Sequence, residues 1–318
     1  MQVITDLSAW PWPDDRSVVT IGMYDGVHLG HRAVIGQVRD RARELGARSV
    51  VVTFDVHPMS ITRPQQAPRL LTTLEHRLSL LGSTGVDAVV VVRFDEVQSN
   101  ETAVDFVTRV LVDGLHTQAV IVGSDFHFGH GRQGNVTLLR EMGERHDFTA
   151  EPVRLVQRAD GVDEPVSSTA IRRALAGGEI DTATRMLGRP HEIHGTVADG
   201  DKRGRTIGFP TANVAVPAEM CLPADGVYAA EYVRPDGTRH ACAVNLGRRP
   251  TFYENQQYSL LEAHLIGFSG DLYGEKAVVR FLAFLRSEKQ FGGIDELKAQ
   301  LVLDIGHASD AVRARTQQ

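Results

Sequence analysis

The chain has 318 residues, of which 42% are hydrophobic and 23% are charged, and its formal net charge at pH 7 is −6. Its length predicts two domains with substantial cores, and its acidic balance gives no electrostatic support for a nucleic-acid partner. The first residues show no basic segment followed by an apolar one, and no apolar run is long enough to span a bilayer, so we expect a cytoplasmic protein without a membrane partner.

Between residues 18 and 187, apolar runs of strand composition alternate with segments of helical periodicity. We expect strands at residues 18–21, 49–54, 88–94, 118–123 and 151–156, and helices at residues 31–45, 74–81, 103–111 and 135–145. Buried-type strands in a βα alternation predict a doubly wound parallel sheet. In such sheets ligands bind at the carboxyl ends of the strands, where the polar loops of this chain fall.

A glycine-rich turn follows the first of these strands and precedes a helix. It reads Gly22-Met23-Tyr24-Asp25-Gly26-Val27-His28-Leu29-Gly30-His31. A strand, a glycine-rich turn and a helix N-terminus together present backbone N–H groups, which favours phosphate binding. His28 and His31 could both donate hydrogen bonds to phosphate oxygens, and Gly30 allows a close approach to the backbone. The alternative is a βα turn with two solvated histidines, because His-x-Gly-His alone is only moderately specific.

The pattern changes after residue 188. Short strand-like runs at residues 191–197, 227–233, 238–246, 260–266 and 276–285 are separated by turn residues, and a helix is expected at residues 294–305. This predicts a small antiparallel β-barrel, with domains at residues 1–187 and 188–318. Cys221 and Cys242 lack metal-binding spacing, and we interpret them as reduced core thiols.

Two sets of motifs carry a resemblance to a known family. The glycine-rich turn resembles the adenylyltransferase signature of the prokaryotic bifunctional riboflavin kinase/FAD synthetase family, with Tyr24 where the family usually carries Phe. The second half resembles flavokinases at Gly204-Arg205-Thr206-Ile207-Gly208-Phe209-Pro210-Thr211-Ala212-Asn213 and, more briefly, at residues 222–228, 245–252, 261–265, 270–274 and 284–288. The resemblance implies an α/β doubly wound parallel-sheet nucleotidylyltransferase domain, then a small antiparallel β-barrel flavokinase domain with a C-terminal helix.

The resemblance also implies the site residues of the first half. His28 and His31 would be catalytic. Nucleotide binding is expected at Gly22, Asp25, Gly30, Ser167, Ser168, Thr169 and Arg172, and flavin binding at Phe54, His57, Asp125 and Phe128. Val56 and Ala170 depart from the family, which often has Pro and Arg there. Read without the resemblance, His57 is a loop histidine with satisfied hydrogen bonds, and the Ser-Ser-Thr segment is a helix cap.

In the second half, the resemblance assigns Glu262 as general base and Thr211 and Asn213 as Mg²⁺ ligands. Nucleotide and flavin binding are expected at Gly204, Arg205, Gly208, Pro210, Thr211, Asn213 and Arg286. A primary alcohol must lose a proton when it attacks a phosphate, so a carboxylate base is expected. Without the surrounding motif, Glu262 is read as an exposed strand carboxylate.

The implied function is flavin cofactor synthesis. Riboflavin and ATP would give FMN, and FMN and ATP would give FAD and pyrophosphate, with Mg²⁺ as cofactor. One alternative is a monofunctional riboflavin kinase with a weakened adenylyltransferase half. A second is a non-catalytic flavin-binding regulator. The sequence leaves the oligomeric state open, and a homo-oligomer is one possibility.

Overall fold

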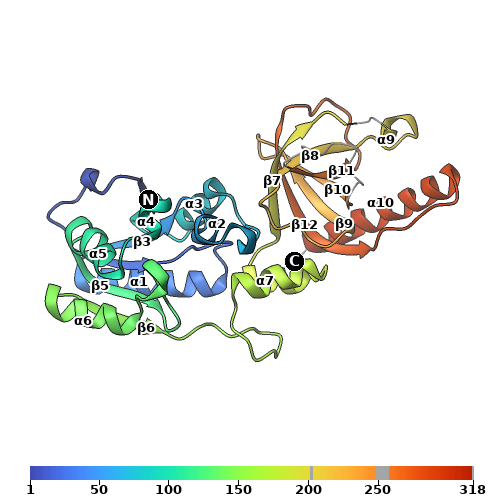
Figure 1. Cartoon of the computed structure of the whole chain (residues 1–318). Coiled ribbons are helices and arrows are strands. Elements are labelled where there is room, and N and C mark those ends of the chain that lie inside the picture. Colours follow the sequence, from blue (N-terminus) through green and yellow to red (C-terminus); the bar gives the residue numbers. More distant parts are fainter. Residues whose placement is uncertain (201–202, 248–257, 317–318) are drawn as a thin grey trace. The chain divides into compact units, whose positions relative to one another are not determined.

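The structure is a computed structural model that describes residues 1–200, 203–247 and 258–316. The chain forms two compact units (Figure 1). The first comprises Met1–Pro68 and Thr73–Ser167, and the second comprises Arg69–Thr72 and Ser168–Gln318. Each unit has its own sheet, so each is described separately.

The first unit is built on a six-stranded sheet in the order β1-β4-β3-β2-β5-β6, and every neighbouring pair is parallel. The strands are β1 (Gln2–Ile4), β2 (Ser17–Ile21), β3 (Arg48–Phe54), β4 (Ala88–Val92), β5 (Thr117–Gly123) and β6 (Thr149–Val153). The chain moves outward from β2 through β3 to β4 and then returns to place β5 on the other side of β2. The carboxyl ends of β2 and β5 are therefore the switch point, where open α/β sheets bind ligands.

Helices cover both faces of this sheet. They are α1 (Leu29–Leu45), α2 (Pro58–Thr62), α3 (Leu74–Gly82), α4 (Glu96–Ser99), α5 (Ala103–Phe106) with a π-helical continuation at Val107–Gly114, and α6 (Val136–His146). Residues of α1 and α3 pack with Val51 and Val89, whereas α5, the π-helical segment and α6 pack with Val50 and Val90. Successive strand residues thus enter opposite cores, which explains their unbroken apolar runs. The predicted doubly wound parallel sheet is confirmed.

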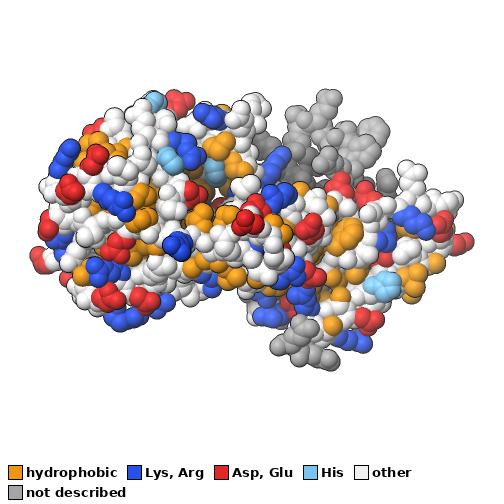
Figure 2. All heavy atoms as spheres, turned by 90° about the horizontal axis from the view of Figure 1, so that it is seen from below, with side chains coloured by type: hydrophobic (Ala, Val, Ile, Leu, Met, Phe, Trp, Pro, Cys, Tyr) orange, Lys and Arg blue, Asp and Glu red, His pale blue; other side chains and the backbone are white. Residues whose placement is uncertain are grey.

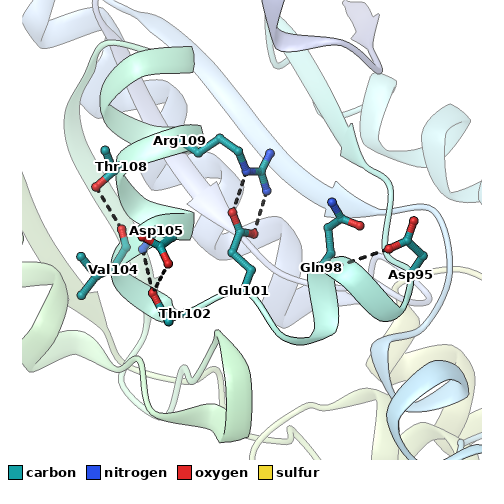
Figure 3. Close-up of polar contacts among 8 residues, drawn as sticks. All are labelled: Asp95, Gln98, Glu101, Thr102, Val104, Asp105, Thr108 and Arg109. Atoms are coloured by element: carbon teal, nitrogen blue, oxygen red, sulfur yellow. Dashed lines mark hydrogen bonds and ion pairs between the residues drawn. The ribbon is translucent and has the colours of Figure 1, made fainter.

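The helix predicted at residues 103–111 begins with a capping arrangement that Figure 3 shows. Thr102 accepts a hydrogen bond from the N–H of Asp105 at 3.1 Å, and its hydroxyl donates to the Asp105 carboxylate at 2.7 Å. Arg109 makes two hydrogen bonds to Glu101, at 2.7 and 2.8 Å. These contacts fix the start of the helix, from which Phe106 packs against Phe128 with ring centroids 5.7 Å apart.

The second unit is a closed antiparallel barrel in the order β10-β11-β8-β7-β12-β9 (Figure 1). Its strands are β7 (His191–Ala198), β8 (Ala212–Pro217), β9 (Gly226–Val233), β10 (Arg239–Leu246), β11 (Tyr258–Leu265) and β12 (Lys276–Arg286). Its helices are α7 (Ser168–Ala176), α8 (Ile180–Leu187), α9 (Arg203–Thr206) and α10 (Ile294–Thr316). α8 packs on β7 and β12, and α10 packs on β9, β10 and β12. The predicted barrel with a closing helix is confirmed.

Several boundaries differ from the sequence predictions. The edge strand β1, the barrel strand β8 and the short helix α9 were not predicted, and α10 runs to Thr316 rather than ending near residue 305. β1 has only three residues, and the motif that leads into β8 is rich in Gly, Pro and Thr, so both strands are hard to recognise from the local sequence. Cys221 and Cys242 are buried and are not joined by a disulfide, as expected.

Charged side chains of both signs are interspersed on the face drawn in Figure 2. On α1, for example, Arg43 pairs with Asp40 at 2.9 Å and Arg41 pairs with Glu44 at 3.0 Å. Such exposed pairs contribute little to stability and describe a solvated helix face. Within the described ranges, each helix is too short or too polar to cross a bilayer.

Two candidate active sites

The glycine-rich turn follows β2 and has a strained backbone. Tyr24, Gly26 and Val27 have φ values of 52°, 82° and 38°. Positive φ is unfavourable for any residue with a side chain and most so for a β-branched one, at roughly 1–3 kcal/mol each. Tyr24 is buried, and its hydroxyl lies 2.6 Å from the Thr20 hydroxyl, so the oxygen that distinguishes it from Phe has a partner.

His28 caps the N-terminus of α1. Its Nδ1 accepts a hydrogen bond from the N–H of His31 at 3.3 Å, so in the neutral ring the proton is on Nε2. The imidazoles of His28 and His31 stack, with centroids 3.5 Å apart and planes inclined by 19°. The predicted histidine pair therefore forms one unit at the start of a 17-residue helix, where backbone N–H groups also favour an anion.

His31 is a neutral side chain in this arrangement. Burial lowers its pKa well below the usual value, and the neighbouring His28 and Arg77 lower it further. Its Nδ1 is buried and has no hydrogen-bond partner among the described residues. His31 can therefore donate a hydrogen bond to a phosphate, as the sequence suggested, but it carries no charge before the phosphate arrives.

Gly30 is required by its neighbours. A Cβ at this position would lie 3.1 Å from two atoms of the His28 ring and 3.1 Å from the carbonyl oxygen of Val166. Asp25, also predicted for nucleotide binding, is buried within the turn at 2% exposure. The turn therefore brings Asp25, His28, Gly30 and His31 together, as the sequence suggested.

The four residues predicted to bind flavin lie at the end of β3 or in the segments that follow β3 and β5. Phe54 ends β3, with its ring 5.6 Å from that of Phe94, and Phe128 stacks on Phe126 at 5.4 Å. His57 caps α2, since its Nδ1 accepts a hydrogen bond from the N–H of Met59 at 3.1 Å. Asp125 is exposed, and its carboxylate would lie 2.9 Å from a Cβ at Gly123. The roles of these residues toward flavin stay predictions.

The Ser-Ser-Thr segment is divided between the units. Ser167 ends the first unit, while Ser168, Thr169 and Arg172 belong to the second. Arg172 donates a hydrogen bond from Nε to the carbonyl oxygen of Arg69. Ala170 is fully buried. The expected phosphate contacts of this segment stay predictions.

On the barrel, several predicted kinase residues line one cavity. The cavity has a volume of about 320 Å³, and Arg205, Pro210 and Thr211 form part of its wall. Residues from the loop between β11 and β12 complete it, including Asp271 and Tyr273. Both residues lie in the 270–274 motif, but no function was predicted for either of them. Gly208 has φ of 92°, a conformation that requires glycine.

A row of polar residues crosses the outside of the barrel. Glu262 on β11 is in register with Asn213 on β8 and with Asn245 on β10. The adjacent register places Leu261 between Val214 and Leu246, all buried inside. Because directly opposed residues on neighbouring strands have Cβ atoms about 4.5–5.5 Å apart, the Glu262 carboxylate lies within reach of both amides.

The same row ends at Arg286, in register with Val227 on β9. Arg286 is held by Asp304 on α10, with hydrogen bonds of 2.9 Å from Nε and 2.7 Å from Nη2. Asp304 is 2% exposed, so this pair anchors α10 to the barrel. The glutamate of the same motif, Glu288, lies against Gly247. Residues 249–252 of the preceding motif lie outside the described residues.

The structure contains a second cavity, which was not predicted from the sequence. It lies in the first unit at the carboxyl ends of β1 and β4, with a volume of about 320 Å³. Its lining includes Leu7, Val92, Gln98 and Arg109. The lining residues are far apart in sequence, and β1 itself was not predicted.

Comparison with known proteins identifies the family of each half of the chain. Residues 11–170 match the FAD synthetase family, and residues 187–312 match the riboflavin kinase family. A bifunctional riboflavin kinase/FMN adenylyltransferase of Listeria monocytogenes is 38% identical over 92% of this chain and 91% of its own length. The Pseudomonas fluorescens protein of the same name is 40% identical over 93% of each chain. A crystal structure described as a macrolide-efflux protein from Streptococcus pneumoniae has a TM-score of 0.79 and 26% identity, covering 95% of this chain and 96% of that one.

A parallel nucleotide-binding sheet and a flavokinase barrel in one chain define an enzyme of flavin cofactor synthesis. The chain belongs to the bifunctional riboflavin kinase/FMN adenylyltransferase family. The resemblance inferred from its motifs is confirmed, as is the interpretation of the chain as a bifunctional enzyme that uses ATP and flavins.

Proposed function

We propose that this chain adenylylates FMN at the carboxyl edge of the first unit's sheet and phosphorylates riboflavin on the outside of the barrel. Domains at residues 1–187 and 188–318 would carry these two activities. The observation that supports this most directly is the row of Asn213, Glu262 and Asn245, because its register sets a carboxylate between two amides, one of which is the expected metal ligand.

Adenylylation needs no base. The FMN phosphate is already an anion, and its oxygen attacks the α-phosphorus of ATP while the bond to pyrophosphate breaks. Catalysis is then positioning and stabilisation of the charge on the phosphates. The stacked pair of His28 and His31 and the N-terminus of α1 supply hydrogen-bond donors for this purpose.

Riboflavin phosphorylation does need a base. The primary alcohol of the ribityl chain attacks the γ-phosphorus of ATP, ADP leaves, and the hydroxyl proton goes to Glu262. Such a base typically contributes a factor of about 10²–10⁴ to the rate. Asn213 and Asn245 flank Glu262 in register and support a fixed orientation of its carboxylate.

The residues at the barrel site fit Mg²⁺. Thr211 and Asn213 offer a hydroxyl and an amide oxygen, which are ligands that a hard cation prefers. The backbone of Gly200 approaches Asn213 so closely that a Cβ there would clash with its amide, so the side chain is held in place. Bound with ATP, Mg²⁺ would neutralise phosphate charge, and Thr211 and Asn213 would hold it.

We further propose a cytoplasmic location. The two cysteines, Cys221 and Cys242, are buried without forming a disulfide, which supports a reducing compartment.

Incubation with riboflavin, ATP and Mg²⁺, followed by chromatography of the flavins, tests the proposal. We expect FMN first and FAD later. FMN alone would indicate a monofunctional kinase, and flavin binding without turnover would indicate a regulator. The domain boundary is tested by comparing fragments 168–318 and 188–318. We expect both to phosphorylate riboflavin, and the longer one to be more stable because α8 packs on the barrel.

A further inference from the structure

Arg77 lies beneath the glycine-rich turn, and no motif marked it. Its side chain is 1% exposed on α3. Nη1 donates a hydrogen bond to the carbonyl oxygen of Met23 at 3.1 Å, and Nη2 donates to the carbonyl oxygen of Phe54. One guanidinium thus joins the turn after β2 to the end of β3.

The Met23 carbonyl oxygen is held twice. Besides Arg77, the Thr53 hydroxyl donates a hydrogen bond to it at 3.1 Å. Met23 directly precedes Tyr24, the first residue of the turn with positive φ. A backbone in such a conformation persists only where its surroundings over-determine it. The contacts from Arg77 and Thr53 are part of that constraint.

Arg77 is also a buried charge. Burial lowers its pKa to about 10, so the side chain stays protonated at neutral pH, while Asp25 and Asp55 raise that pKa. Asp25 belongs to the turn and Asp55 follows β3, so both linked segments provide compensating charge. Burial of a cation costs desolvation free energy, which is offset only where hydrogen bonds of good geometry and nearby negative charges compensate it.

We propose that Arg77 is a positioning residue for adenylyl transfer, which locks the turn that carries His28 and His31 to the end of β3 that carries Phe54. This inference rests on the proposed function of the first unit. If Arg77 served folding alone, its replacement would change the stability of the unit and leave the turnover of the folded enzyme unchanged.

The test compares Arg77→Lys, Arg77→Met and, as control, Arg140→Met, which removes an exposed arginine from α6 in the same unit. Both tryptophans of the chain, Trp10 and Trp12, lie in the first unit, so their fluorescence reports whether that unit is folded. The kinase rate of the same molecule reports whether the second unit is folded. Adenylylation is measured with FMN and ATP, as kcat and KM separately.

We expect Arg77→Met to lose about 10²-fold in adenylylation kcat, because a misplacement near 1 Å costs that much. Arg77→Lys keeps the charge but not the two-pronged donor geometry, so a smaller loss is expected. Kinase turnover should change by less than about twofold in every variant, and Arg140→Met should match wild type. The imidazole pKa of His31, followed by NMR, should rise in Arg77→Met and stay low in Arg77→Lys.

Wild-type adenylylation kcat in folded Arg77→Met overturns the inference. If Arg77→Met fails to fold, Arg77→Lys decides: a folded lysine variant with wild-type kcat shows that only the buried charge matters and overturns it, whereas a reduced kcat supports it. A wild-type enzyme that makes FMN but no FAD is a different result, since it refutes the adenylylation function itself.

Discussion

The two sites are built by different parts of their folds. In the first unit, the candidate groups sit on a strained turn after β2, beyond the sheet's hydrogen bonds, and side chains such as Thr20 and Arg77 hold it. In the second unit, Asn213, Glu262 and Asn245 are strand residues, and the barrel's register aligns them. A loop site depends on a few tertiary contacts, whereas a strand site is fixed by the ladder that also makes the fold.

The difference matches the two reactions. An anionic phosphate needs donors and a close approach, which a glycine-rich turn and a helix N-terminus provide. An alcohol needs a carboxylate at a fixed distance, which a rigid strand provides. Substitutions should therefore separate the activities, and four experiments test this, from the largest expected effect to the smallest.

Glu262→Gln should give the largest effect. The amide keeps the shape of the side chain but cannot take the proton, so the kinase kcat should fall by about 10²–10⁴ with little change in KM. The same variant, supplied with FMN, should make FAD at a near-normal rate. Steady-state kinetics of both reactions measure this, with the exposed Glu219→Gln as control. A kinase rate close to wild type would make Glu262 a structural residue.

The reciprocal change is His28→Asn combined with His31→Asn. Asparagine is a good N-cap, so α1 keeps its cap while both imidazoles are lost. FAD synthesis should fall by about 10²–10³, the usual effect of removing preorganised donors, while riboflavin is still converted to FMN. Chromatography of the flavins provides the measurement. Loss of both activities in a folded protein would contradict the two-site interpretation.

Gly30→Ala tests the close packing of the turn. Its Cβ would press on the His28 ring and on Val166, so we expect FAD synthesis to fall by about tenfold with the kinase unchanged. Gly36→Ala on the same helix is the matched control, because a Cβ there meets nothing within 4 Å. It should stabilise α1 by about 0.5–1 kcal/mol and leave both activities intact. Equal rates of FAD synthesis in the two variants would show that the turn accommodates a Cβ at Gly30 without displacing its neighbours.

The smallest effect concerns pH. Because the pKa of His31 is lowered in the folded unit, below about pH 6.5 the unfolded chain takes up a proton that the folded chain does not. The free energy of unfolding therefore has its full value above that pH. It decreases as the pH falls toward the pKa of His31 in the folded unit, by up to about 1.4 kcal/mol per pH unit. Urea unfolding followed by tryptophan fluorescence should show a weaker decline in His31→Asn. An identical slope would mean that His31 titrates normally.

Much of the fold is readable from local patterns. The βα alternation of residues 18–187 predicted the parallel sheet because the central strands β2, β3 and β4 are buried on both faces and therefore read as unbroken apolar runs. The motifs around His28, Thr211 and Glu262 marked both sites. A single histidine, threonine or glutamate would not have marked a site, but the surrounding motifs are continuous in the sequence and can be recognised there.

The sequence by itself thus determined the two fold classes, the family and most of the chemical groups. Only the tertiary structure decided that His31 is neutral, that Arg77 ties two loops together, and that Glu262 stands between Asn213 and Asn245. Burial, charge neighbours and strand register are relations between segments far apart in the chain. Arg77, for instance, is 54 residues from Met23, and in the sequence it looks like any arginine on an amphipathic helix.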